Sequence, residues 1–157
     1  MSDKAKFTSA VDAIAFMQAG MARFTLRSVK TGTRFTYRMT ESEDGKVFFV
    51  GLLTGSDNDT SYSYLGIVNT YGFRRTAKSR IGKDEPGHKA FAWTWRQLSE
   101  GHLPDVLEVW HEGHCGRCGR TLTVPESIAA GIGPECSRRI GAKHKRRVRA
   151  YARFSAD

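Results

Sequence analysis

Hydrophobic residues recur at helical spacing near the start of the chain. Between Val11 and Met17 they follow an i, i+3, i+4 order, Thr8 or Ser9 precedes them as a capping residue, and Gly20 follows as a stop signal. This pattern predicts a short amphipathic helix that packs one side against the rest of the protein.

The pattern then changes to a period of two, which predicts a β-hairpin. Residues 23–27 and 34–39 alternate between apolar and polar side chains, and Gly32 lies in the turn between them, where a left-handed backbone is favoured. Because side chains on a strand alternate between faces, the hairpin has two unlike faces. The apolar face carries Phe24, Leu26, Phe35, Tyr37 and Met39, and the polar face carries Thr25 and Thr36 with Arg23, Arg27, Arg34 and Arg38.

The four arginines of the hairpin, named here the arginine face, have two interpretations. A sheet surface of arginine and threonine can bind phosphates or an acidic protein patch. It is also typical of an ordinary solvent-facing strand whose cations pair with nearby carboxylates, here Glu41, Glu43 and Asp44. The sequence leaves both interpretations open.

Later segments complete the prediction of an α+β fold. Residues 47–53 are almost continuously apolar, which predicts a central strand buried on both sides, and residues 62–68 predict another strand. Residues 71–80 are irregular and basic, whereas residues 88–100 carry an apolar helical stripe that ends at Gly101. We therefore expect a small antiparallel sheet of four or five strands with covering helices.

Length and composition suit one packed unit with a small appendage. The chain has 157 residues, of which 39% are hydrophobic and 11% aromatic, which is ample for a core. No apolar stretch is typical of a signal peptide or a membrane span, so we expect a protein of the reducing cytoplasm without a membrane partner. The predicted division is an α+β sheet domain at residues 1–104 and a metal module at residues 105–157.

All three cysteines of the chain gather in that second part, at positions 115, 118 and 136. Two residues separate Cys115 from Cys118, a spacing that lets both thiolates reach one Zn²⁺ ion while backbone N–H groups of the turn stabilise their charge. Seventeen residues separate Cys118 from Cys136, as between the halves of zinc-ribbon and treble-clef modules. Buried hydrophobic cysteines or a disulfide are the alternatives, but the clustering and the turn glycines favour zinc.

A fourth zinc ligand has three candidates among the histidines. We favour His111, which ends an apolar run four residues before Cys115. His144 is the second choice, since it follows Cys136 by about two helical turns, the usual place for a treble-clef ligand. His114 is adjacent to Cys115, and neighbouring side chains of an extended chain point to opposite sides.

The same residues carry a resemblance. The run Cys-Gly-Arg-Cys-Gly-Arg-Thr-Leu-Thr-Val-Pro-Glu-Ser from Cys115, followed by Gly-Ile-Gly-Pro-Glu-Cys from Gly131, resembles a small uncharacterised zinc-finger-like domain of bacteriophage and prophage proteins. It covers about the last third of the chain. The resemblance implies a metal-binding module with Cys115, Cys118 and Cys136 as ligands and a phage setting, hence the cytoplasm of a bacterial host. It implies no chemistry.

Positive charge concentrates at the end of the chain. Residues 137–157 have a net charge of +7, whereas the other 136 residues share +2. Such a block, predicted to continue as a helix beyond Cys136, favours a polyanionic partner, although a solubilising tail is the plain alternative. The expected nucleic-acid contacts are Arg138, Arg139, Lys143, Lys145, Arg146, Arg147 and Arg149, with the arginine face as a second contact.

The sequence contains no catalytic constellation, and we do not expect an enzyme. A zinc site with four protein ligands leaves no position for a reactive water, and the order of His111, His114 and the cysteines does not fit a zinc deaminase. The leading hypothesis is a zinc-containing nucleic-acid-binding accessory protein, with DNA placed before RNA. The competing hypothesis is a phage protein that binds and inhibits a host defence or transcription protein, using the loops at residues 55–61 and 71–87.

Overall fold

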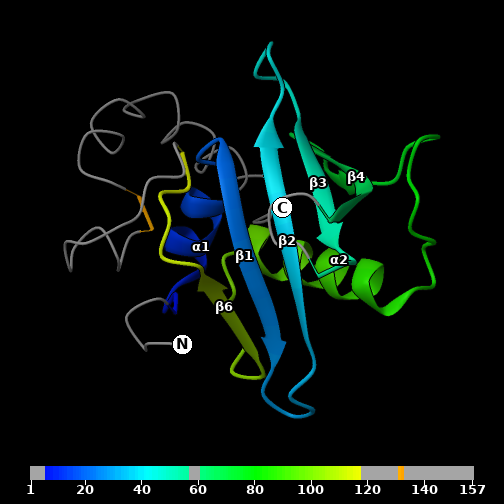
Figure 1. Cartoon of the computed structure of the whole chain (residues 1–157). Helices are drawn as coiled ribbons and strands as arrows, with labels where there is room; N and C mark the ends of the chain where they lie inside the picture. Colours follow the sequence, from blue (N-terminus) through cyan, green and yellow to red (C-terminus); the bar gives the residue numbers. More distant parts are fainter. Residues whose placement is uncertain (1–5, 57–60, 118–130, 133–157) are drawn as a thin grey trace.

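The computed structural model describes residues 6–56, 61–117 and 131–132 (Figure 1). Two helices are present in these residues, α1 (Ala10–Met17) and α2 (Pro86–Ser99). The strands are β1 (Met21–Ser28), β2 (Arg34–Glu41), β3 (Phe48–Leu53), β4 (Tyr62–Asn69), β5 (Gly72–Arg74) and β6 (Leu107–His111). The protein is therefore α+β, as predicted.

The six strands form one antiparallel sheet in the order β5-β4-β3-β2-β1-β6. Strands β1 to β5 pair in chain order as a meander. Strand β6 returns after α2 to the far edge and pairs with β1. Outside β6, Lys6 bridges Trp110, and the Phe7 N–H donates to the Val109 carbonyl at 2.9 Å.

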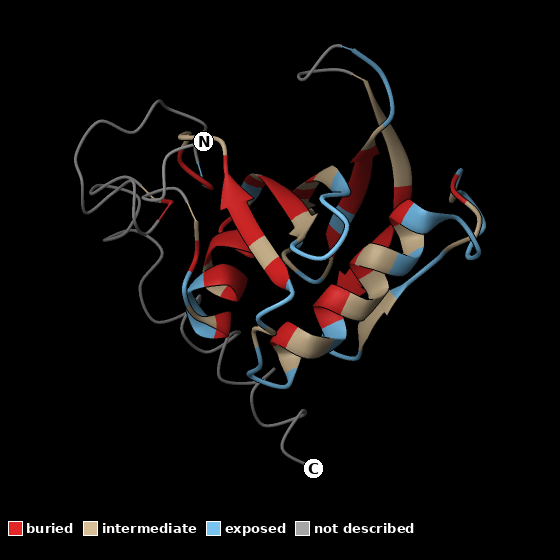
Figure 2. Ribbon diagram, turned by 90° about the horizontal axis from the view of Figure 1, so that it is seen from below, coloured by how far each residue is buried: buried red, intermediate tan, exposed pale blue. Residues whose placement is uncertain are grey.

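Both helices pack on the same face of the sheet, and this face holds the core (Figures 1 and 2). The ring of Phe91 from α2 lies 5.2 Å from Tyr37 and 6.4 Å from Phe24, centroid to centroid. The Tyr37 hydroxyl donates to the carbonyl of Gly87 at 2.7 Å, and burial raises the pKa of Tyr37 far above its ordinary value. Phe16 of α1 is also fully buried in this cluster.

The predicted helices and hairpin are confirmed, with two corrections: Val11 of the expected apolar stripe is 59% exposed, and α2 begins at Pro86, inside the stretch expected to be a loop. The Ser9 side chain accepts from the Asp12 N–H and caps α1, and Pro86 occupies the first turn of α2. Gly32 has a φ of +72° in the hairpin turn, and Gly101 has a φ of +80° after α2. Local sequence therefore suffices for these elements.

Three expectations about the sheet need correction. Strand β3 is not buried on both sides, because Phe49 points away from the helices and is 46% exposed. The stretch taken as irregular contains the short strand β5, and the sheet has six strands rather than four or five. Strand β6 lies within the stretch assigned to the metal module, so that stretch begins inside the sheet; the division near residue 105 stays a prediction.

Candidate metal centre and arginine face

The arginine face lies on the side of the sheet opposite the helices, as predicted. In the hairpin register Arg23 lies opposite Arg38, and Arg27 lies opposite Arg34. Thr25 and Thr36 face each other between these pairs, and their hydroxyl oxygens are 2.8 Å apart. The intervening residues face the core, where Phe24, Leu26, Tyr37 and Met39 are buried and Phe35 packs at the margin.

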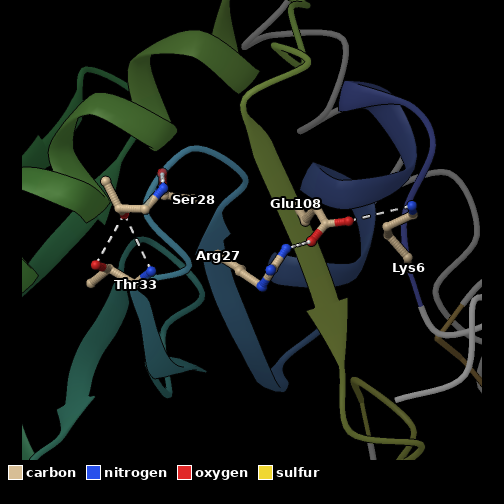
Figure 3. A network of polar contacts seen from close by, with 6 residues as sticks. Lys6, Arg27, Ser28, Thr33 and Glu108 are labelled. Atoms are coloured by element: carbon tan, nitrogen blue, oxygen red, sulfur yellow. Dashed lines mark hydrogen bonds and ion pairs between the residues drawn. The ribbon is translucent and has the colours of Figure 1, made fainter.

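Glu108 of β6 is the main acidic partner of this face. Arg27 Nη1 donates to Glu108 Oε1 at 2.6 Å, and Lys6 Nζ lies 3.5 Å from Glu108 Oε2 (Figure 3). The hydrogen bond from Arg27, aided by the one from Lys6, holds the pKa of Glu108 below its ordinary value. The carboxylate is thus kept ionised between two cations.

The other three arginines differ in their surroundings. Arg23 Nε lies 3.8 Å from Glu112 Oε2, and the guanidinium carbon of Arg38 lies 4.7 Å from the centre of the Tyr62 ring. Arg34 is exposed and has no carboxylate partner in the part of the chain that the structure describes. Two arginines are therefore paired with glutamates, and two are not.

The carboxylates expected to pair with the arginine face were partly the wrong ones. Asp44 instead organises its own turn, accepting from the Ser42 hydroxyl at 2.7 Å and the Lys46 N–H at 3.0 Å. The partners of Arg27 and Arg23 are Glu108 and Glu112. Sequence reasoning missed both glutamates. Glu108, Trp110 and Glu112 are each two positions apart, and residues at this spacing share one face of a strand.

A hollow of about 250 Å³ lies beside the Arg27–Glu108 pair and is lined by Thr25, Arg27, Arg34, Glu108 and Trp110. Trp110 is 8% exposed, and its Nε1 atom is buried without a hydrogen-bond acceptor among the described residues. Indole nitrogen and guanidinium groups only donate hydrogen bonds. The hollow therefore has the guanidinium side chains of Arg27 and Arg34 beside one carboxylate that is already bound by two cations.

The start of the predicted zinc knuckle docks on the sheet. Cys115 is 1% exposed, and its Sγ atom accepts from the Arg117 N–H at 3.4 Å. A backbone donor of this kind stabilises a thiolate, as expected for the first ligand of a knuckle. The next residue, Gly116, accepts from the Met21 N–H at 2.6 Å, which ties the knuckle to the beginning of β1.

Two glycines join the halves of the cysteine motif. The Gly116 N–H donates to the Gly131 carbonyl at 2.8 Å. A Cβ atom would lie 2.7 Å from the Phe16 ring at position 116 and 2.5 Å from it at position 131, so only glycine fits both places without displacement. Gly131 precedes Cys136 by five residues in the sequence, and it lies beside the residue that follows Cys115.

His111 lies near the knuckle but is engaged elsewhere. It is 2% exposed, and its ring lies 5.6 Å from both Phe7 and Phe16, the residue that Gly116 also contacts. Its Nδ1 atom accepts from the Gly113 N–H at 2.9 Å. A neutral imidazole that accepts at Nδ1 carries its proton on Nε2, so metal binding by His111 requires loss of this hydrogen bond. His111 stays a prediction as the fourth ligand.

The remaining predicted site residues can be placed only in part. The described residues contain no group of three His, Cys, Asp or Glu side chains suited to a metal ion, but they include only Cys115 and His111 of the four favoured ligands. His114 has a buried Nδ1 atom without a partner in these same residues. Outside the described residues lie Cys118, Cys136, His144 and the cations Arg138, Arg139, Lys143, Lys145, Arg146, Arg147 and Arg149.

Fold and site together define a small α+β protein whose sheet has one face packed by helices and one basic face. A model for a family of unknown function, DUF6011, matches residues 106–141, a stretch that includes β6 and all three cysteines. No curated protein and no solved structure matches the chain. Among the described helices, neither is long and apolar enough to cross a membrane.

Proposed function

We propose that this protein binds nucleic acid through the arginine face and the basic segment at residues 138–149. In this proposal a Zn²⁺ ion anchors the C-terminal module beside the sheet. Its ligands are Cys115, Cys118, Cys136 and a histidine, for which His111 is the first candidate. One observation carries the proposal: four arginines from two paired strands share a sheet face that no described helix covers. DNA is the first ligand to test, and RNA is the second.

The physical support comes from charge and accessibility. Arg34 and Arg38 have no described carboxylate partner, so their guanidinium groups are available to phosphate oxygens, which they match in bidentate geometry. Arg23 and Arg27 are held in place by Glu112 and Glu108. An antiparallel sheet fixes the backbone positions from which these side chains extend, so binding orders only the side chains.

The test is a binding titration at several salt concentrations with duplex DNA, single-stranded DNA and RNA. Replacing both Arg34 and Arg38 with alanine should weaken binding and reduce the slope of log K against log salt by about 0.9 per lost phosphate contact on duplex DNA. Arg96→Ala is the matched control, since Arg96 is an exposed arginine on α2 at the opposite side of the sheet. Absence of binding to all three nucleic acids at low salt would reject the proposal.

The zinc part of the proposal has its own test. The donor set fits zinc, because the Cys115 thiol already receives a backbone hydrogen bond and the chain supplies two further cysteines. Elemental analysis of the purified chain should give one zinc per molecule, and Cys115→Ser should lower both the zinc content and the thermal stability. Retention of zinc by His111→Ala would move the fourth ligand to His144 or His114.

The alternative proposal is a phage protein that inhibits a host protein in the bacterial cytoplasm. Its expected loop at residues 71–87 is tied to the sheet, since the Arg80 N–H donates to the Tyr64 carbonyl of β4 at 2.9 Å. Within the loop, Arg75 Nε donates to the Ile81 carbonyl at 2.9 Å. A pull-down from host lysate with and without nuclease separates the two proposals. A protein partner that is retained after nuclease treatment and lost on loop mutation would favour this alternative.

A further inference from the structure

The open face of the sheet changes character from one side to the other. On β1 and β2 it carries arginines and threonines, whereas on β3 and β4 it carries aromatic rings. Phe49 is 46% exposed, and Tyr62 and Tyr64 are half-buried. The strand register places Arg23, Arg38, Gly51 and Tyr64 opposite one another in one row across four strands. Cations and rings therefore share one continuous surface.

Gly51 joins the basic and aromatic parts. Because position 51 has no side chain, Arg38 can extend over β3 to Tyr62 on β4, where the guanidinium carbon lies 4.7 Å from the ring centre. A Cβ atom at position 51 would lie 3.2 Å from the Tyr62 Cβ. Phe49 and Tyr64 meet edge to face with centroids 6.4 Å apart. Ring and guanidinium planes of this kind are surfaces on which nucleic-acid bases stack.

The hollow at the other side of this face suits a phosphate group. Arg27, Arg34 and Trp110 all line it, and the buried Trp110 Nε1 has no acceptor among the described residues. Glu108 also lines the hollow, but Arg27 and Lys6 already bind its two oxygens. A phosphate in this hollow would contact Arg34, which has no described carboxylate partner, beside Arg27.

The spacing between the two parts indicates an oligonucleotide rather than a mononucleotide. Trp110 lies on β6 and Tyr62 on β4, four strand spacings apart in the sheet order, or about 19 Å. Aromatic rings on the open face of a sheet can contact the planes of bases only when those bases are not stacked on one another. In a duplex the planes are covered by neighbouring base pairs, whereas a single strand can turn them outward.

We infer that the open sheet face binds single-stranded nucleic acid, with bases stacked over Phe49, Tyr64 and the Arg38–Tyr62 pair and a backbone phosphate in the hollow at Arg27, Arg34 and Trp110. This inference rests on the proposed function and specifies its ligand. The partner is a single strand of several nucleotides, bound without base-specific readout because stacking accepts every base.

The experiment is a fluorescence-anisotropy titration of the whole chain with labelled oligo-dT and oligo-U of about 15 nucleotides and with a duplex of equal length, at one low salt concentration. Oligo-dT or oligo-U should bind at least several-fold tighter than the duplex. Phe49→Ala and Tyr64→Ala should each weaken single-strand binding on the order of tenfold and leave duplex binding unchanged. Tyr71→Ala is the matched control, because Tyr71 is 85% exposed but lies in the turn after β4, away from these rings.

A second set of variants tests the phosphate position. Arg34→Ala should weaken oligo-dT binding several-fold by removing a phosphate contact, and Arg96→Ala should have no effect. Thermal melting of each variant identifies those that fail to fold, and Phe49→Ala is the variant expected to keep its stability, because Phe49 is 46% exposed. Two results together would overturn the inference: the duplex binds as tightly as oligo-dT and oligo-U or more tightly, and Phe49→Ala and Tyr64→Ala leave the affinity for single strands unchanged. The proposal of nucleic-acid binding would then still stand. No binding to any probe would overturn both.

Discussion

The two faces of the sheet are built from alternate residues of the same strands, yet they differ in almost every property. On the helix-covered face, Phe24, Tyr37 and Met39 have no exposed surface and contact both helices through one core. The open face of the sheet carries four arginines and three threonines on β1 and β2 and three partly exposed aromatic residues on β3 and β4. The covered face holds the hydrophobic core, whereas the open face presents charged and aromatic side chains.

This difference separates residues needed for stability from residues available for binding. Exposed arginines on strands are ordinary, but exposed aromatic rings beside them are harder to explain by solubility. Substitutions on the covered face should change stability, and substitutions on the open face should change ligand binding with little effect on stability.

The largest expected effect compares two phenylalanines. Phe91→Ala removes a fully buried ring from the core and should lower the free energy of unfolding by about 3–5 kcal/mol. Phe49→Ala, on the open face, should lower it by less than about 1 kcal/mol. Urea unfolding followed by circular dichroism measures both. Similar losses for the two variants would mean that the open face is part of the core.

An intermediate effect is expected where the knuckle meets the covered face. Gly116→Ala places a Cβ atom 2.7 Å from the Phe16 ring and 3.1 Å from the Phe16 carbonyl, so α1 or the knuckle must shift. We expect a loss of about 1–3 kcal/mol in the free energy of unfolding. Gly82→Ala is the control, since its nearest contact would be an ordinary 3.8 Å to Glu85. A neutral Gly116→Ala would contradict the close docking of the knuckle on Phe16.

The smallest effect concerns Glu108 on the open face, and it depends on pH. Its folded-state pKa is lowered from an ordinary value of 4.5, chiefly by Arg27, so the stabilisation is present above that value and is lost as pH falls through the folded pKa. Glu108→Gln should therefore lower the free energy of unfolding at pH 7 by at most about 1 kcal/mol. Urea unfolding from neutral to acidic pH should show this difference disappear below the folded pKa. A difference that persists in acid would assign the loss to packing rather than charge.

Local patterns predicted the local structure of the sheet domain well. The two helices and the arginine face follow from side-chain periodicity, which depends on nearest neighbours along the chain. The prediction failed at Phe49 because a continuous apolar run is compatible with a strand buried on one side or on both. It also missed β5, which has only three residues and includes a glycine and an arginine.

Contacts between distant segments were not predictable in the same way. Arg27 and Glu108 are separated by 81 positions, and nothing in either local pattern identifies the other as its partner. The hydrogen bond between Gly113 and His111 likewise depends on a turn geometry that ligand spacing does not reveal. The cysteine spacing still predicts a zinc site, and the contact between Gly116 and Gly131 gives that prediction a structural basis without testing it.

The return of β6 to the edge of β1 has a consequence for the order of folding. Strands β1 to β5 pair with sequence neighbours and close short loops, whereas β6 must find a partner about 80 residues away and is then flanked by Lys6. Contacts between residues so far apart in the sequence generally form late. We therefore expect the meander to assemble first and β6 to join last, so that newly made chains display the aromatic part of the open face before the hollow at Trp110 exists.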